Sequence, residues 1–285
     1  TSTTCGISSD SGRRQTWLDQ LWTGFSGLLW GNQDEVERQE ARVVGGSEIP
    51  IAEAPFMVYV ESEIINNKFN CSGVIISNQY ILTAARCVRI IYTYGYNTTV
   101  ILNATLVTVW VGSATNKGGT SIVADSWKTN TKFETVTNWE PIALIHLPTP
   151  LTFSESIQPI CYPTTDDLHA VSGCSKNEYG WGATDWTGNV FSPKLKKLSD
   201  ITIQTENTCR VTDDMRFFCV TANANNTGAC FHGDFGGPFV VRYGGRAFVI
   251  GVFSGSVDLY CGSGGPAIYM RASNFADWVK SVVKP

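Results

Sequence analysis

The side chains with the clearest chemical potential in this chain are its nine cysteines and three histidines. The histidines, His146, His169 and His232, lie far apart in the sequence. No two cysteines have the Cys-x-x-Cys spacing that is common in zinc sites. We therefore expect disulfide bonds, an oxidising extracellular environment, and no metal or other cofactor.

Composition limits the class of protein. The chain has 285 residues, 43% of them hydrophobic and 16% charged, with a formal net charge of -4. This composition suffices for a substantial core and provides no basic surface for nucleic acid. No apolar run reaches the roughly 18 residues of a membrane span. The sequence begins at Thr1 without an apolar signal core, so we expect a processed or trimmed soluble chain.

Three sequons of the type Asn-x-Ser/Thr agree with a secreted protein. They begin at Asn97, Asn103 and Asn225. We expect these three residues to be candidate sites of N-glycosylation.

From Val43 onward, the sequence has the pattern of a mainly β protein. Short β-forming runs, separated by Gly, Asn, Ser and Pro, predict a barrel or sandwich. These runs are Phe56–Val60, Gly73–Ile76, Tyr80–Ala84, Val107–Val111, Ile142–Leu147, Phe239–Arg242 and Ala247–Val252. A C-terminal helix is predicted with Ser273 or Asn274 as its N-cap. Its apolar face would consist of Phe275, Trp278, Val279 and Val282.

Residues 1–42 differ in composition from residues 43–285 and are expected to form a light-chain or pro-segment. Within them, residues 15–30 are rich in Trp and Leu, with an approximate helical period interrupted by Gly24 and Gly27. Two interpretations remain open for this segment. It packs on its own domain, or it is a helix that binds a partner.

A series of short motifs follows in order along the chain. They are Arg42–Gly46, Cys71–Ile76, Ile81–Cys87, Ile142–Ile145, Tyr179–Gly182, Gly233–Pro238 and Pro266–Tyr269. In this order and spacing they resemble the motifs of the trypsin/chymotrypsin family of serine proteases. The resemblance covers Val43 to Pro285 and implies two six-stranded antiparallel β-barrels with a cleft between them and a C-terminal helix.

The resemblance also implies that the catalytic triad is replaced. In the family, a serine attacks a carbonyl, a histidine takes its proton, and a buried aspartate orients the histidine. The corresponding histidine, aspartate and serine positions here are Arg86, Pro141 and Phe235. A guanidinium stays protonated and cannot act as a base. Glu140, one residue before the aspartate position, is expected to point elsewhere.

Two histidines are candidates for a substitute base, although neither provides a nucleophile. We favour an ordinary strand residue for His146 and an ordinary loop or cleft residue for His232. The nucleophile loop has two residues between its cysteine and Gly-Asp, where the family has one. The N–H groups of Gly233 and Phe235 are therefore not expected to converge on an oxyanion.

The specificity pocket is also altered according to the resemblance. Its positions are Gly228, Ser254, Ser256 and Ala267. Gly228 at the base provides no carboxylate for a substrate Lys or Arg, and the wall lacks the usual tryptophan. A glycan on Asn225 would lie near the pocket mouth, unless Asn225 is unmodified or faces outward.

The activation motif of the family is retained. Arg42 and Val43 correspond to the cleavage site, and Asp234 corresponds to the aspartate that pairs with the newly freed amine. Either this switch still operates, or the motif is inherited and idle.

The resemblance implies four disulfide bonds. They are Cys5–Cys161, Cys71–Cys87, Cys209–Cys219 and Cys230–Cys261. Cys174 is left unpaired, as a buried free thiol or as one end of an intermolecular bridge.

We therefore expect a secreted, non-catalytic serine protease homologue that acts by binding protein. Its role would be that of a regulator, cofactor or decoy in an extracellular proteolytic cascade of immunity or reproduction. The partner would be a protease, its substrate or an inhibitor. The alternatives are a serine-type endopeptidase with unrecognised residual chemistry and a receptor ligand or toxin scaffold.

Overall fold

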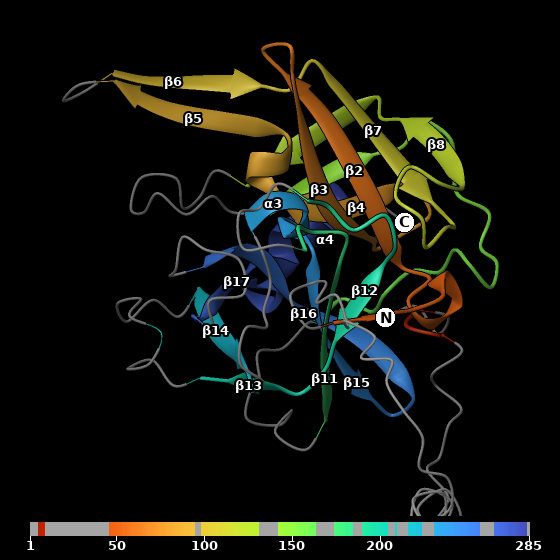
Figure 1. Cartoon of the computed structure of the whole chain (residues 1–285). Coiled ribbons are helices and arrows are strands. Elements are labelled where there is room, and N and C mark those ends of the chain that lie inside the picture. The colour runs from red at the N-terminus through yellow and green to blue at the C-terminus, as the bar shows by residue number, and fades with distance from the viewer. Residues whose placement is uncertain are drawn as a thin grey trace, which may run out of the picture.

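The fold consists mainly of two curled antiparallel sheets (Figure 1). The computed structural model describes residues 5–8, 46–94, 98–130, 142–163, 174–184, 190–204, 209, 216–223, 231–256 and 265–283. Its strands are β1 (Ser47–Glu48), β2 (Met57–Ile64), β3 (Asn67–Ile75), β4 (Tyr80–Ala84), β5 (Arg89–Tyr94), β6 (Thr98–Asn103), β7 (Leu106–Val111), β8 (Thr120–Val123), β9 (Ser126–Thr129), β10 (Ile142–His146), β11 (Ser175–Gly180), β12 (Lys196–Leu198), β13 (Ile201–Ile203), β14 (Phe217–Ala222), β15 (Pro238–Tyr243), β16 (Arg246–Ser256) and β17 (Ala267–Arg271). Its helices are η2 (Ile51–Glu53), η3 (Ala85–Cys87), α3 (Phe231–Asp234), η4 (Ala272–Phe275) and α4 (Ala276–Val282).

The N-terminal sheet has seven strands in the order β8-β7-β2-β3-β4-β10-β9. Along β7, Val107, Val109 and Val111 are buried, whereas the residues between them are exposed or half-buried. This alternation turns one face of the strand toward the core, since successive side chains of a strand point to opposite faces. β4 and β10 are neighbours in the sheet and are buried over most of their length.

The C-terminal sheet has eight strands in the order β1-β12-β11-β15-β16-β17-β14-β13. Its first strand, β1, precedes the entire N-terminal sheet in the sequence and reaches across to pair with β12. The two-barrel architecture is therefore confirmed. The strand numbers differ from six in each barrel, and short edge strands of two to four residues account for the difference.

A hairpin formed by β5 and β6 is a separate two-stranded sheet. It projects from the N-terminal sheet at the top of Figure 1. The sequence patterns did not predict these strands. At the base of the hairpin, Ile90 and Leu102 pack against the main core, and Arg89 is buried.

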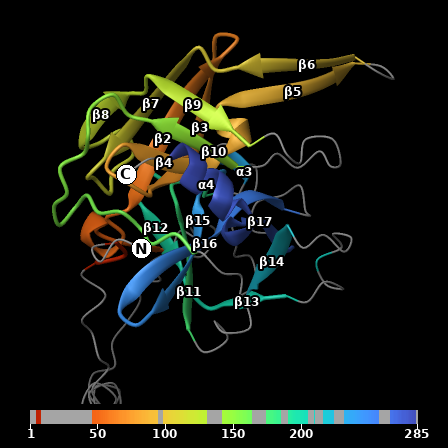
Figure 2. The same cartoon turned by 180° about the vertical axis from the view of Figure 1, so that it is seen from behind.

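The predicted C-terminal helix is present as η4 followed by α4. Figure 2 shows α4 in front of the two sheets, where Phe275 and Val279 are buried in the main core. The predicted N-cap was wrong, because Ser273 and Asn274 lie inside the 3₁₀ turn η4. The N-cap position of α4 is Phe275, which makes no side-chain cap hydrogen bond. The first N–H of α4, on Ala276, instead bonds to the carbonyl oxygen of Ser273.

No helix in the described part of the chain is long and apolar enough to cross a membrane.

Two groups of buried side chains form the core. The larger group includes residues of both sheets, among them Val60, Leu82 and Ile142 from the N-terminal sheet and Val240 and Ile268 from the C-terminal sheet. The smaller group lies within the C-terminal sheet. It contains Phe239 and Tyr269, whose ring centroids are 5.4 Å apart in an edge arrangement.

One carboxyl group is buried in the C-terminal sheet. Glu178 on β11 accepts a hydrogen bond of 2.7 Å from the hydroxyl of Tyr269 on β17, and both residues are buried. Burial raises the pKa of Glu178 to about 7, the Tyr269 hydrogen bond opposes this increase, and the negative charge of Asp234 adds to it. Glu178 therefore keeps its proton at pH values where an exposed glutamate has lost it.

This buried carboxyl predicts a pH-dependent stability. The pKa rises from 4.5 to about 7 on folding, so the stabilisation is fully present below about pH 4.5 and is lost as pH rises through about 7. Glu178→Gln cannot ionise and preserves an acceptor for Tyr269. We expect this variant to exceed the wild type in free energy of unfolding by on the order of 2 kcal/mol at about pH 8, and by much less at about pH 4.5. Urea unfolding of both proteins at the two pH values measures this difference. A difference that does not change with pH would contradict the assignment.

Candidate functional site

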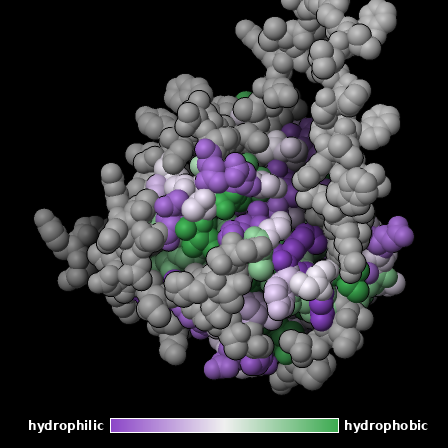
Figure 3. Space-filling model, turned by 90° about the horizontal axis from the view of Figure 1, so that it is seen from below, coloured by the Kyte–Doolittle hydropathy of each residue, from purple (hydrophilic) through white to green (hydrophobic). Residues whose placement is uncertain are grey.

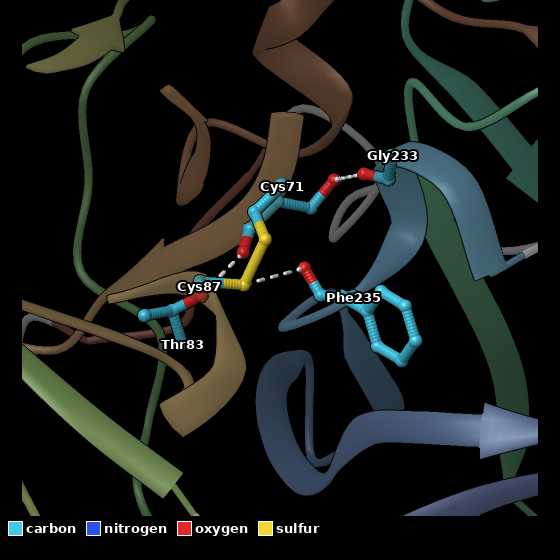
Figure 4. The surroundings of a disulfide bond; sticks show 6 residues. Cys71, Thr83, Cys87, Gly233 and Phe235 are labelled. Carbon is cyan, nitrogen blue, oxygen red and sulfur yellow. Dashed lines mark hydrogen bonds between the residues drawn. A yellow bond between two sulfur atoms is a disulfide. The ribbon is translucent and has the colours of Figure 1, made fainter. Parts of the chain in front are cut away.

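The site forms where the turn Gly233–Gly237 of the C-terminal half meets β3 and β4 of the N-terminal sheet (Figure 4). The N–H of Ser72 donates to the carbonyl oxygen of Phe235 at 2.8 Å. The hydroxyl of Ser72 donates to the carbonyl oxygen of Gly233 at 3.0 Å. The hydroxyl of Thr83 in turn donates to the carbonyl oxygen of Ser72 at 2.8 Å. These bonds fix the turn against the other sheet.

Gly236 permits this close approach. Its φ angle is +79°, and a Cβ atom there would lie 2.0 Å from Oγ1 of Thr83 and 2.4 Å from the carbonyl oxygen of Ser72. Any other residue would have to push the turn away from β4. The contact between the two halves of the fold thus requires glycine at position 236, the second glycine of the Gly-Asp-Phe-Gly-Gly-Pro motif.

The disulfide Cys71–Cys87 lies directly under the turn (Figure 4). It connects β3 to η3, the short helix that carries Arg86. The Sγ atom of Cys87 is 3.5 Å from the carbonyl oxygen of Phe235. A bridged sulfur has no proton to donate, so this is a packing contact. The disulfide holds η3 next to the turn.

The side chains of Arg86 and Phe235 contact each other across the site. The guanidinium carbon of Arg86 lies 4.3 Å from the centroid of the Phe235 ring, which is a cation–π geometry. The ring also packs against both core groups, with its centroid 5.6 Å from that of Phe253. Sequence reasoning identified both positions but missed their contact, because each motif was interpreted separately.

Asp234 lies at the end of α3 and is buried. Its Oδ1 accepts a hydrogen bond of 2.9 Å from the N–H of Gly182. A Cβ atom at Gly180 would lie 2.0 Å from the Asp234 carboxylate, and one at Gly182 would lie 2.1 Å from it. The Gly-Trp-Gly motif therefore makes room for this carboxylate. The proposed cleavage residues Arg42 and Val43 lie outside the described residues.

The expected pocket positions are only partly described. Ser254 on β16 and Ala267 on β17 are buried, and Ser256 pairs with Ala267 across the two strands. Ser254 directly follows Phe253, against which Phe235 packs, along β16. Gly228 lies outside the described residues, as does Pro141 at the aspartate position.

Of the two candidate substitute bases, His146 lies at the end of β10 that is farther from Arg86. Ile142 at the start of β10 pairs with Ala84, two residues before Arg86, whereas His146 pairs with Tyr80. Ile142 and His146 are four residue steps apart along the strand, or about 13 Å. The Nδ1 atom of His146 is instead 2.6 Å from Oδ1 of the exposed Asp125, an interaction that lowers the pKa of Asp125. The backbone of His232 lies in α3, and its side chain lies outside the described part.

The N-terminal segment is attached to the C-terminal sheet. The disulfide Cys5–Cys161 provides the covalent link. Gly6 donates through its N–H to the carbonyl oxygen of Pro159 at 2.6 Å and accepts a bond from the N–H of Ala247 at 2.9 Å. The described part of this segment is Cys5–Ser8, and the boundary expected at residue 42 lies outside the described residues.

The disulfides agree with the expected pairing wherever the chain is described. Cys209–Cys219 is the third bond present, and Cys174 is a free, half-buried cysteine. Cys230 and Cys261 lie outside the described residues.

One of the three sequons is described. Asn103 is exposed at the end of β6. Asn97 and Asn225 lie outside the described residues.

Within the described ranges, no cluster of three or more His, Cys, Asp or Glu residues could hold a metal ion.

Comparisons with known proteins agree with this geometry. A family model described as Trypsin matches residues 43–279. The chain is 28% identical over 248 residues to "Serine protease SP24D" of Anopheles gambiae, covering 86% of this chain and 83% of that protein. The solved structure "HL collagenase" has a TM-score of 0.68 and 24% identity, and the match covers 84% of this chain and 99% of that one. The structural likeness concerns the fold, whereas the family model spans most of the sequence. The chain therefore belongs to the trypsin family.

Proposed function

We propose that this trypsin-family chain is a secreted protein without proteolytic activity that acts by binding another protein. Its role is that of a regulator, cofactor or decoy in an extracellular proteolytic cascade of immunity or reproduction. The partner is a protease, a protease substrate or an inhibitor. The observation that carries the proposal is the contact between Arg86 and Phe235.

According to the family resemblance, this contact lies where a histidine would take the proton of the attacking serine. A guanidinium cannot accept the proton of a nucleophile, and a phenyl ring has no nucleophilic atom. The two side chains also contact each other, and the ring of Phe235 packs against that of Phe253. The proposal therefore assigns them a packing role. A peptidase with a different mechanism is the competing hypothesis, but His146, one of its two candidate bases, lies about 13 Å along β10 from the site.

The absence of catalysis is directly testable. We expect no turnover of peptide substrates above background and no labelling by a fluorophosphonate probe, before or after cleavage at Arg42, because base and nucleophile are both lacking. A trypsin sample treated in parallel serves as the positive control. Activity that stays with the protein through repurification would contradict the proposal.

Restoring the three triad residues tests whether their replacement alone explains the expected lack of proteolytic activity. The triple variant Arg86→His, Pro141→Asp and Phe235→Ser is expected to remain inactive or very weak, because the longer nucleophile loop and altered pocket remain. Removal of the Phe235 ring should also lower the free energy of unfolding by about 2 kcal/mol, less than for a fully buried phenylalanine. Recovery of activity within about tenfold of a trypsin would show that the surrounding site is still competent.

The packing role of the Arg86–Phe235 contact predicts a coupling energy. In a double-mutant cycle on the free energy of unfolding with Arg86→Met and Phe235→Leu, we expect the two effects to be non-additive by about 0.5–1.5 kcal/mol. Lys128→Met combined with Phe235→Leu is the control, because Lys128 is exposed on β9. That control pair should be additive. If the effects of Arg86→Met and Phe235→Leu on the free energy of unfolding were additive, the proposed packing role of their contact would be contradicted.

The proposal also includes a working activation switch, supported by the buried position of Asp234. Asp234 accepts a hydrogen bond from the N–H of Gly182, and the family resemblance implies that a freed Val43 amine would pair with the same carboxylate. Solvent and salt would screen such a buried ion pair only weakly. The disulfide Cys5–Cys161 would keep the N-terminal segment attached after cleavage.

The switch predicts a change in stability and in binding on cleavage. Trypsin-like cleavage after Arg42 is expected to raise the free energy of unfolding of the wild type by about 1–3 kcal/mol and to tighten partner binding by roughly 5- to 150-fold. Cleaved Asp234→Asn should show neither effect, and Arg42→Gln is the uncleavable control. N-terminal sequencing verifies the new end at Val43. Equal values for cut wild type, uncut wild type and cut Asp234→Asn would identify the motif as idle.

A further inference from the structure

The β5–β6 hairpin has the longest edge strands of any sheet in the described part of the chain. Both strands have six residues, and within the described residues they pair only with each other. An edge strand presents unpaired N–H and C=O groups and is a template for pairing with another chain. The other edges are shorter: β1 has two residues, β13 has three, and β8 and β9 have four.

The outer strand of the hairpin is β6. In both views it lies on the side of β5 that is farther from the sheets (Figures 1 and 2). Its side chains Val100 and Ile101 are 37% and 46% exposed. Figure 3 shows the protein from below, on the side away from the hairpin. In the coloured part of that face, hydrophilic residues are mixed with hydrophobic ones. The middle of β6 therefore presents exposed apolar side chains next to an edge that no described strand pairs with.

The charge pattern indicates which occupant fits this edge. Residues 90–103 include no Asp, Glu, Lys, Arg or His. When two copies of a strand pair antiparallel about a two-fold axis, the residue at the axis faces itself, so any charge there meets a like charge. With the axis at Val100, residues Thr98 to Leu102 pair with their copies, and no charged side chain is present. This strand therefore suits a second copy of itself, which the short β9 edge with Lys128 does not.

We propose that the protein self-associates through antiparallel pairing of β6 with β6 of a second copy, so that the two hairpins form one four-stranded sheet. The inference goes beyond the proposed function and does not require a partner protein. A glycan on Asn103 would leave the edge itself open, because strand side chains point out of the sheet and not along its hydrogen-bonding direction. Main-chain hydrogen bonds provide the pairing, and Val100 and Ile101 provide apolar contact on the two faces.

The test is the oligomeric state of the full chain by analytical ultracentrifugation over a wide concentration range. The wild type should show a reversible monomer–dimer equilibrium. Val100→Lys and Val100→Glu should each raise the dissociation constant by about tenfold or more, because like charges then face each other. An equimolar mixture of the two variants should restore association, which a variant with an unfolded hairpin would not do.

The control is Val123→Lys, which places the same charge on the exposed β8 edge, where Val123 is 54% exposed. It should leave the dissociation constant unchanged. Hydrogen exchange at Thr98–Asn103 should slow with concentration in the wild type. A protein that is monomeric at every concentration would leave the edge to a strand of another protein or to solvent, and would overturn the proposal. A dimer without slower exchange in β6 would overturn it as well.

Discussion

The turn Gly233–Gly237 is held against β3 and β4, and the arrangement of the site depends on this contact. Ser72 binds the turn through its N–H and its hydroxyl, and Thr83 fixes Ser72 from the other side. Gly236 allows the approach because no Cβ atom fits there. Once the turn is fixed, the positions of Phe235 and Asp234 follow, since one residue points its ring toward Arg86 and the other its carboxylate toward Gly182.

A contact made for chemistry and a contact made for packing impose different demands on the same position. A catalytic pair needs a titratable base and a nucleophile that remain accessible to substrate. Arg86 and Phe235 satisfy neither demand, but a cation over a ring contributes about 0.5–2 kcal/mol, depending on desolvation. The ring also joins the two core groups. The two residues that replace the base and the nucleophile in our proposal thus form a packing contact between the two halves of the fold.

The sequence predicted much of this structure, and three features were missed for separate physical reasons. The order and spacing of the motifs carried the resemblance to the trypsin family, and this resemblance implied the two-sheet fold and the pairing of Cys71 with Cys87. The β5–β6 hairpin was missed because its strands belong to neither main sheet. The predicted N-cap of α4 was wrong because a 3₁₀ turn precedes the helix and accepts a hydrogen bond from its first N–H. The burial of Glu178 beside Tyr269 was not predictable, because a single acidic residue in a strand gives no signal of its partner.

Arg86 and Phe235 form one packed unit across the two halves of the fold. Side-chain NMR of Arg86 detects this contact, because protons over an aromatic ring experience its ring current. In the wild type, we expect the Hδ and Hε resonances of Arg86 to be shifted upfield from ordinary arginine values, and Phe235→Leu should return them to those values. Ordinary shifts in the wild type, unchanged in Phe235→Leu, would contradict the claim.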